Sequence, residues 1–201
     1  MKRIRLVVSF VCFAWCALAL AAVAKDAGEL VQRTADQVTA RVKSERAVLR
    51  KDSVRLHQLV DELIIPHFDF SRMSQWVLGK YWRSADAAQR SRFVEEFRKL
   101  LVKTYATALL EYADRETRYF PVRAESDATL VTVRTEIEQP GSAVVPINYR
   151  MHVKDNAWKV FDVSVDGVSL VATYRASFAS EIRKSGIDSL IKSLEAKNEK
   201  K

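Results

Sequence analysis

The spacing of apolar residues changes from a helical period to a strand period near Thr117, and this change constrains the fold most. Before it, apolar residues recur every three or four positions. After it they alternate with polar residues, and in the stretch 145–153 every odd position is apolar. A chain that is first helical and then stranded favours the α+β class, in which a helical layer covers an antiparallel sheet.

The helical period predicts six helices. Asp52 is suited to cap one of them and Ser84 or Asp86 another, and Gln89 gives Asp86 the partner that a capping box needs. Gly79 and Gly186 mark two C-terminal ends. The expected ranges are 26–49, 53–65, 66–79, 86–112, 167–185 and 187–194.

Four strands follow from the alternating pattern. A turn at 139–142 precedes the third strand, and Asp155 with Asn156 forms a tight hairpin before the fourth. The expected ranges are 117–123, 128–138, 145–153 and 158–165. Short turns between consecutive strands predict a four-stranded antiparallel meander with one face covered by helices and the other partly wet.

Residues 1–24 have the three parts of a secretory signal peptide. A basic start is followed by the apolar run Leu6–Leu20 and by Ala22-Val23-Ala24, a small-x-small cleavage site. We expect cleavage after Ala24, which leaves 25–201 as a single exported domain. Two alternatives stay open: an uncleaved anchor, because residues 6–24 could just span a bilayer, and lipidation of Cys16, which the preceding Trp15 disfavours.

The leader also holds both cysteines, Cys12 and Cys16. The mature chain therefore has no thiol, which excludes disulfides, zinc–thiolate sites, iron–sulfur clusters and cysteine nucleophiles. Removing Lys2, Arg3 and Arg5 lowers the formal net charge from +8 to +5. A modest charge, spread along an exported chain, gives no reason to expect a nucleic-acid partner.

Catalytic signatures are scarce. His67 and Asp69 could form an acid/base pair, but positions i and i+2 of a helix point to different faces, and Asp69 near a helix start is expected to bind backbone N–H groups. His57 and His152 have no partner at metal-ligand spacing, and no glycine-rich phosphate loop is present. We expect no metal and no cofactor.

Aromatic residues are abundant, with six Tyr, nine Phe and four Trp, of which only Phe10, Phe13 and Trp15 lie in the leader. Such side chains could fill a solid core or line a cavity. Periodicity does not distinguish these two arrangements.

Several stretches, in this order, carry a resemblance to one family: Leu63–Phe70 with Met73, Val77–Arg83, Arg92–Arg98 with Leu101 and Thr104-Tyr105, and Trp158–Val163 running into Asp166–Val171 with Tyr174, Arg175 and Phe178. Together they resemble the toluene-tolerance (MlaC) family of periplasmic phospholipid-binding proteins, from about residue 30 to 194. Gln75, Lys80 and the pair Ala172-Thr173 depart from the family pattern, which bears on headgroup or partner contacts more than on the cavity.

The resemblance implies an NTF2-like curved sheet that encloses acyl chains against helices and leaves the headgroup near the surface. It implies a monomeric, non-enzymatic periplasmic carrier of glycerophospholipid that maintains outer-membrane lipid asymmetry. The implied partners are an inner-membrane ABC transporter bearing an MCE-domain ring and an outer-membrane lipoprotein–porin complex. A lipid-ester hydrolase and an adaptor or chaperone with a solid core are the rival interpretations.

Two acyl chains of about fifteen methylenes each, at roughly 0.8 kcal/mol per buried CH₂, cost of order 20 kcal/mol to expose to water. A carrier therefore needs a deep apolar pocket, and which face of the second and fourth strands turns inward is left open. Arg98, Arg150 and Arg175 are candidates for phosphate or partner contacts, and Tyr105 and Tyr174 for the mouth. The expected lining is Val131, Val133, Tyr149, Met151, Phe161 and Val163 on the sheet, and Phe97, Leu101, Tyr105, Leu109, Val171 and Tyr174 on helices.

Overall fold

The computed structural model describes the backbone of residues 5–124, 128–139, 141 and 143–199, and the side chains from residue 27 onward within these ranges. The expected signal peptide and its cleavage site lie outside the residues whose side chains are described. Within the part of the chain so described, no helix combines the length and the hydropathy needed to cross a bilayer.

Seven α-helices and one 3₁₀ helix form within the described backbone. They are α1 (Arg5–Leu49), α2 (Ser53–Leu63), η1 (Ile65–His67), α3 (Phe70–Leu78), α4 (Lys80–Ser84), α5 (Ala87–Tyr112), α6 (Leu170–Ser185) and α7 (Ile187–Glu199).

The expected caps are confirmed. The Asp52 carboxylate accepts a hydrogen bond from the Arg55 amide at 2.9 Å. Asp86 and Gln89 form the reciprocal capping box at the start of α5. Gly79 ends α3 with φ +54°, and a Cβ at this position would lie 3.1 Å from the Arg175 guanidinium. Local side-chain chemistry therefore sets these helix ends.

The single helix expected over 66–79 is wrong. The chain forms η1, becomes extended at Phe68, and starts α3 only at Phe70. The Asp69 amide donates to the Val160 carbonyl at 2.8 Å, which attaches the extended stretch to the sheet edge. The Asp69 carboxylate then caps α3. Pairing with a strand distant in sequence overrode local helical preference, and α4 was not expected at all.

The five strands run in the order β1-β2-β3-β4-β5, and every neighbouring pair is antiparallel. Asp155 and Asn156 both have positive φ, as a tight two-residue hairpin between β3 and β4 requires. The expected α+β class and meander are confirmed, with one short strand more than expected. The strands are β1 (Thr117–Tyr119), β2 (Leu130–Ile137), β3 (Val145–Lys154), β4 (Ala157–Val165) and β5 (Val168–Ser169).

A bulge in β4 decides which of its side chains face inward. Tyr149 pairs with Val163 and Met151 pairs with Val160, so two residues of β4 stand opposite one residue of β3. Phe161 consequently lies on the opposite face of the sheet from Val163. The alternating pattern that would place these two residues on the same face fails here.

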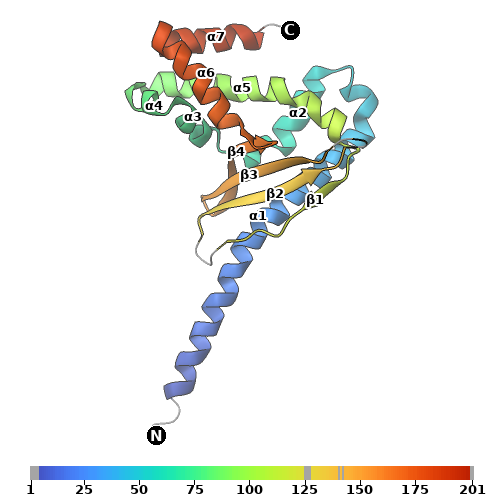
Figure 1. The fold of residues 1–201 in the computed structure, drawn as a ribbon, viewed down its shortest axis with the longest axis vertical. Helices are drawn as coiled ribbons and strands as arrows, with labels where there is room; N and C mark the ends of the chain where they lie inside the picture. The colour runs from blue at the N-terminus through green and yellow to red at the C-terminus, as the bar shows by residue number, and fades with distance from the viewer. Residues whose placement is uncertain (1–4, 125–127, 140, 142, 200–201) are drawn as a thin grey trace.

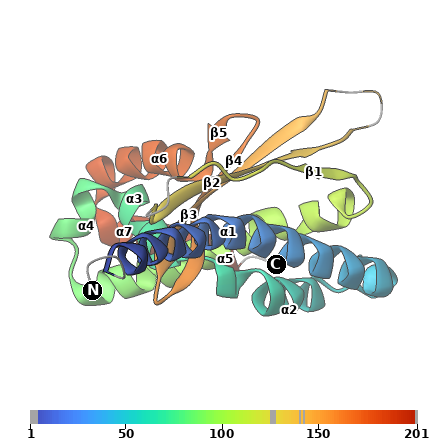
Figure 2. The same ribbon diagram turned by 90° about the horizontal axis from the view of Figure 1, so that it is seen from below.

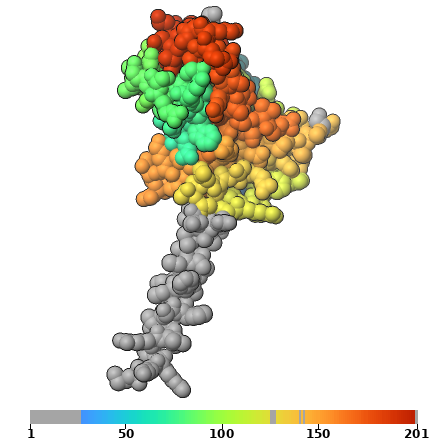
Figure 3. Space-filling view, turned by 60° about the vertical axis from the view of Figure 1, so that its left-hand side comes forward, coloured from blue at the N-terminus to red at the C-terminus, as the bar shows by residue number. Residues whose placement is uncertain are grey.

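The helices lie on both sides of the curved sheet (Figures 1 and 2). On one side α1 packs on the sheet through Ala27 and Val31, and α1, α2 and α5 form a second buried cluster. On the other side α3, α6 and α7 pack with α5 and with Phe161 of β4. Figure 3 shows this helical end, green to red, above the yellow and orange strands. Space remains between α1, α5 and the sheet.

Candidate functional site

A cavity of about 360 Å³ lies between α1, the α2–η1 segment, α5 and one face of the sheet. An apolar cavity of about 150 Å³ already holds a benzene molecule, so this one has room for a larger apolar ligand. Its lining includes Leu30, Ala35 and Val38 of α1, Val60, Ile64, Ile65 and Phe68 of α2–η1 and the residue after it, Leu101, Tyr105, Ala106 and Leu109 of α5, and Ile137, Ile147, Tyr149, Met151, Val160 and Val163 of the sheet.

The helices that border the cavity contribute short side chains as well as large ones. The α1 face that borders the cavity carries Thr34, Ala35, Val38 and Thr39, and α5 contributes Ala106 among others. None of the α1 residues was predicted, although a helix whose buried face carries few large side chains was a usable signal in the sequence.

Half of the predicted lining residues border the cavity. They are Leu101, Tyr105 and Leu109 of α5, and Tyr149, Met151 and Val163 of the sheet. Tyr105 and Val165 both border the cavity and are each 39% exposed, so both also reach solvent. The expectation that Tyr105 lies at the mouth agrees with this placement.

Four predicted lining residues belong instead to the solid helical core. Phe97, Val171 and Tyr174 pack there, and the rings of Phe97 and Tyr174 lie edge to face with centroids 5.3 Å apart. The β4 bulge directs Phe161 into the same cluster. Helical periodicity marks a buried face but does not say which partner buries it.

Val131 and Val133 face the cavity side of the sheet, because they pair with Met151 and Tyr149. They nevertheless do not border the cavity. The part of α1 that carries Ala27 and Val31 covers them, with Ala27 fully buried against this cluster. The sequence left open which face of this strand turns inward; in the structure Val131 and Val133 lie on that face, but their position along the strand puts them beneath α1.

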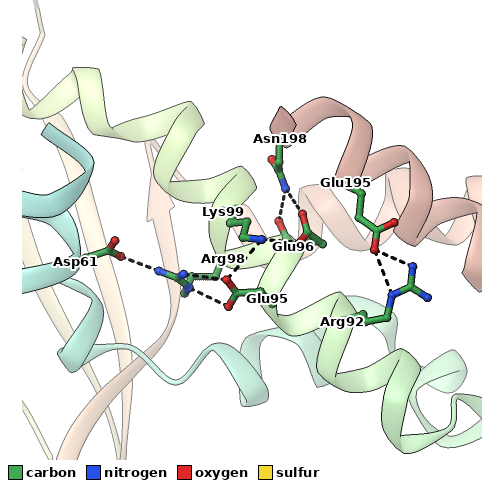
Figure 4. Close-up of polar contacts among 8 residues, drawn as sticks. All are labelled: Asp61, Arg92, Glu95, Glu96, Arg98, Lys99, Glu195 and Asn198. Carbon is green, nitrogen blue, oxygen red and sulfur yellow. Dashed lines mark hydrogen bonds and ion pairs between the residues drawn. The ribbon is translucent and has the colours of Figure 1, made fainter. Parts of the chain in front are cut away.

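Arg98 forms ion pairs on a surface of α5 that does not border the cavity. Its guanidinium lies 2.6 Å from the Asp61 carboxylate of α2 and 3.0 Å from that of Glu95 (Figure 4). The same surface holds the pairing of Arg92 with Glu195 of α7 at 2.7 Å. Arg98 therefore links helices and does not border the cavity.

Arg150 and Arg175 also lie away from the cavity. The Arg150 guanidinium stands 5.2 Å from the Trp76 ring centroid and 4.9 Å from that of Phe161, on the other face of the sheet. Arg175 packs against Gly79. The expected contact of these two arginines and Arg98 with a phosphate at the cavity is not supported by their positions, and contact with a partner stays a prediction.

The cavity wall is uncharged at neutral pH. Burial raises the pKa of Tyr149 to about 12. The side chain is half-buried by solvent accessibility, and it borders the cavity. Burial lowers the pKa of His67, and Lys159 and Arg33 lower it further. In the helical core, burial and a hydrogen bond with Tyr105 raise the pKa of Tyr174 to about 12. An uncharged, apolar wall suits a hydrocarbon ligand.

Asp69 is unavailable to His67. Its carboxylate accepts from the Arg72 amide at 3.0 Å, from His152 Nε2 at 3.0 Å and from Lys154 Nζ at 3.1 Å. Because the Arg72 guanidinium can only donate, at 2.9 Å, His152 Nδ1 must accept and Nε2 carries the proton. Asp69 binds a backbone N–H as expected, but its pairing with His152 was not foreseen, since the two are distant in sequence.

Burial opposes ionisation of Asp69, but the hydrogen bond from the Arg72 amide and the interaction with Lys154 lower its pKa. This cluster links α3 to β3. The polar groups of Asp69 and His152 are engaged in hydrogen bonds and ion pairs within the cluster. Among the residues with described side chains, no group of three or more His, Cys, Asp or Glu could hold a metal ion.

Comparison with known proteins matches most of the chain. A family model described as MlaC protein matches residues 32–196. The chain is 28% identical over 166 residues to the intermembrane phospholipid transport system binding protein MlaC of Haemophilus influenzae, covering 81% of this chain and 77% of that protein. It is 26% identical over 170 residues to the toluene tolerance protein ttg2D of Pseudomonas putida, covering 84% and 79%.

A solved structure has the same fold. The phospholipid-binding protein from Ralstonia solanacearum, in complex with a phospholipid, aligns with a TM-score of 0.79 and 33% sequence identity. The alignment covers 86% of this chain and 96% of that one. The elements that surround the cavity lie largely within the matched range.

Proposed function

The chain belongs to the MlaC family, and on this premise we propose that it binds a glycerophospholipid and carries it through the periplasm. The observation that supports the proposal is the apolar cavity between the helices and the sheet. A wall without charged groups cannot offset the hydration of an ion, but it can shelter methylene groups from water. The acyl chains therefore provide the binding free energy.

The solved relative from Ralstonia solanacearum contains a phospholipid. The transfer of that ligand class to this chain rests on the shared fold and on the cavity. An adaptor with a solid core is disfavoured, because its interior would not contain an apolar cavity of about 360 Å³. A hydrolase is disfavoured because the Asp69 carboxylate is occupied by His152, Lys154 and the Arg72 amide.

The proposal includes the route of the lipid. Residues 25–201 act as one monomeric domain after removal of the signal peptide, and they exchange lipid with an inner-membrane ABC transporter and an outer-membrane lipoprotein–porin complex. A soluble container is the physical requirement of such a route, since free phospholipid tails would each cost many kcal/mol in water.

Native mass spectrometry of protein purified from a Gram-negative periplasm tests the proposal. We expect an added mass equal to a phospholipid, which denaturation releases. The Tyr105→Asp variant should lose most of this adduct, because it places a charge at the mouth of the cavity. Phe120→Asp is the matched control, since Phe120 is similarly exposed at 37% but does not border the cavity. Wild-type protein without any lipid adduct would contradict the proposal.

A further inference from the structure

Basic side chains gather where η1 meets α1 and β4, at one border of the cavity. His67 lines the cavity directly. Lys159 of β4 donates from Nζ to the Pro66 carbonyl at 2.6 Å, beside His67. On α1, Arg33 directly precedes Thr34, which also lines the cavity. Arg33 and Lys159 are close enough to His67 to lower its pKa.

Some basic groups of this fold have acidic partners and others do not. Arg92 and Arg98 are ion-paired with carboxylates. Within the described side chains, neither Arg33 nor Lys159 forms an ion pair. Two cations without acidic partners, together with an imidazole at the edge of an apolar cavity, favour the binding of an anionic group there.

This site lies away from the C-terminal part of α5, which carries Tyr105 and Tyr112. Arg46 of α1 pairs with Asp114, just after α5, at 2.7 Å. Arg33 precedes Arg46 by 13 residues, which is about 20 Å of helix. The basic groups therefore mark one end of the α1 wall, and Tyr112 lies near the other.

We propose that Arg33, His67 and Lys159 bind the phosphodiester of the lipid headgroup while the acyl chains fill the cavity. This assignment rests on the proposed function and adds to it the position and the chemical class of the polar contact. The Arg33 guanidinium offers a planar fork of donors to phosphate oxygens, and Lys159 offers a compact charge. A phosphodiester carries one negative charge, which these cations neutralise.

The first test compares two short-chain ligands that share their acyl chains and differ in the phosphoglycerol headgroup: dihexanoylphosphatidylglycerol, which has it, and dihexanoylglycerol, which lacks it. Changing both Arg33→Glu and Lys159→Met should weaken binding of the phospholipid of order tenfold or more, because a charge-assisted contact is lost at each position. Binding of dihexanoylglycerol should stay within about twofold. Lys159→Met keeps the aliphatic stem, so the variant retains its packing.

Arg115→Glu is the control. Arg115 lies three residues after Tyr112, at the other end of the α1 wall, and has no ion pair within the described side chains. An equal loss of phospholipid binding in this control would overturn the proposal, because it would indicate a diffuse charge effect. So would an equal loss of both ligands in the double variant.

The second test follows the His67 imidazole by NMR titration in the wild-type protein. With dihexanoylphosphatidylglycerol bound, the pKa of His67 should be at least half a unit higher than with dihexanoylglycerol bound, because the phosphate offsets Arg33 and Lys159. Equal pKa values would overturn the proposal. An equal rise with inorganic phosphate alone would assign the site to free phosphate and overturn it as well.

The outcomes separate this proposal from the proposed function. If the proposed function fails, the wild-type protein binds neither dihexanoyl ligand. If only the phosphate site fails, both ligands bind and the double variant binds them as the wild type does.

Discussion

Removal of the bound lipid should destabilise the fold, because the apolar side chains that line the cavity lose their contacts with the acyl chains. In well-packed cores an unfilled cavity costs about 24 cal/mol per Å³, so a volume of about 360 Å³ corresponds to about 9 kcal/mol. Water that enters through the mouth beside Tyr105 lowers this cost, which makes the figure an upper bound. It is comparable to the whole stability of an ordinary domain, about 5–15 kcal/mol.

The measurement uses one protein in two states. Protein refolded from guanidinium without lipid is compared with the same protein reloaded with phosphatidylglycerol, by thermal unfolding. If only half of the upper bound is realised, the empty protein should have a Tm lower by about 10 °C or more, at roughly 2–4 °C per kcal/mol for a chain of this size.

A variant that fills the cavity with its own side chains provides the control. Changing Ala35→Leu and Ala106→Leu together adds methyl groups to two walls of the cavity. The difference in Tm between the empty and loaded states should become smaller in this variant, and its lipid occupancy should fall. Equal Tm values for the two states of the wild-type protein, or an unchanged difference in the variant, would refute the reasoning.

Three further predictions concern parts of the fold that surround the cavity. Val133→Asp buries an unpaired charge beneath α1 and should lower the free energy of unfolding by roughly 3 kcal/mol in chemical denaturation, whereas Thr132→Asp, exposed on the other face, should change it by less than about 0.5 kcal/mol. Burial and the nearby guanidinium lower the pKa of His152, and burial lowers that of His67, so the unfolded chain takes up protons first. Stability should be flat above about pH 6.5 and fall below it, with a weaker fall in His152→Gln; a stability that rises from pH 6.5 to 5.5 would contradict this. Asp86→Ala removes the cap of α5 and should cost about 1 kcal/mol, measured by urea unfolding, and no loss would mean that the capping box contributes nothing.

Features set by neighbouring residues were predictable. The Asp86–Gln89 capping box, the Asp155-Asn156 hairpin and the C-terminal end of α3 at Gly79 all appear where the sequence indicates them. Each depends on groups within a few positions of one another, so no knowledge of the rest of the fold is needed.

The site was predictable only in part. Tyr149 and Met151 alternate on β3 as their pattern requires, and both border the cavity. Phe161 was placed wrongly because one bulge shifts the alternation of β4, and a bulge leaves no reliable mark in the apolar pattern. Phe97 was placed wrongly because a buried helical face can pack on another helix as well as on a cavity.

The sequence by itself determined the capped helix ends, the order of the four expected strands and the alternation along β3, because these follow from spacing and from side chains close together along the chain. Only the tertiary structure decided that α1, α5 and the sheet leave a cavity between them, and that Arg33 and Lys159 lie close enough to His67 to lower its pKa. Whether buried surfaces meet or leave a space depends on the distance between packed elements. That distance is fixed by contacts between residues far apart in the chain.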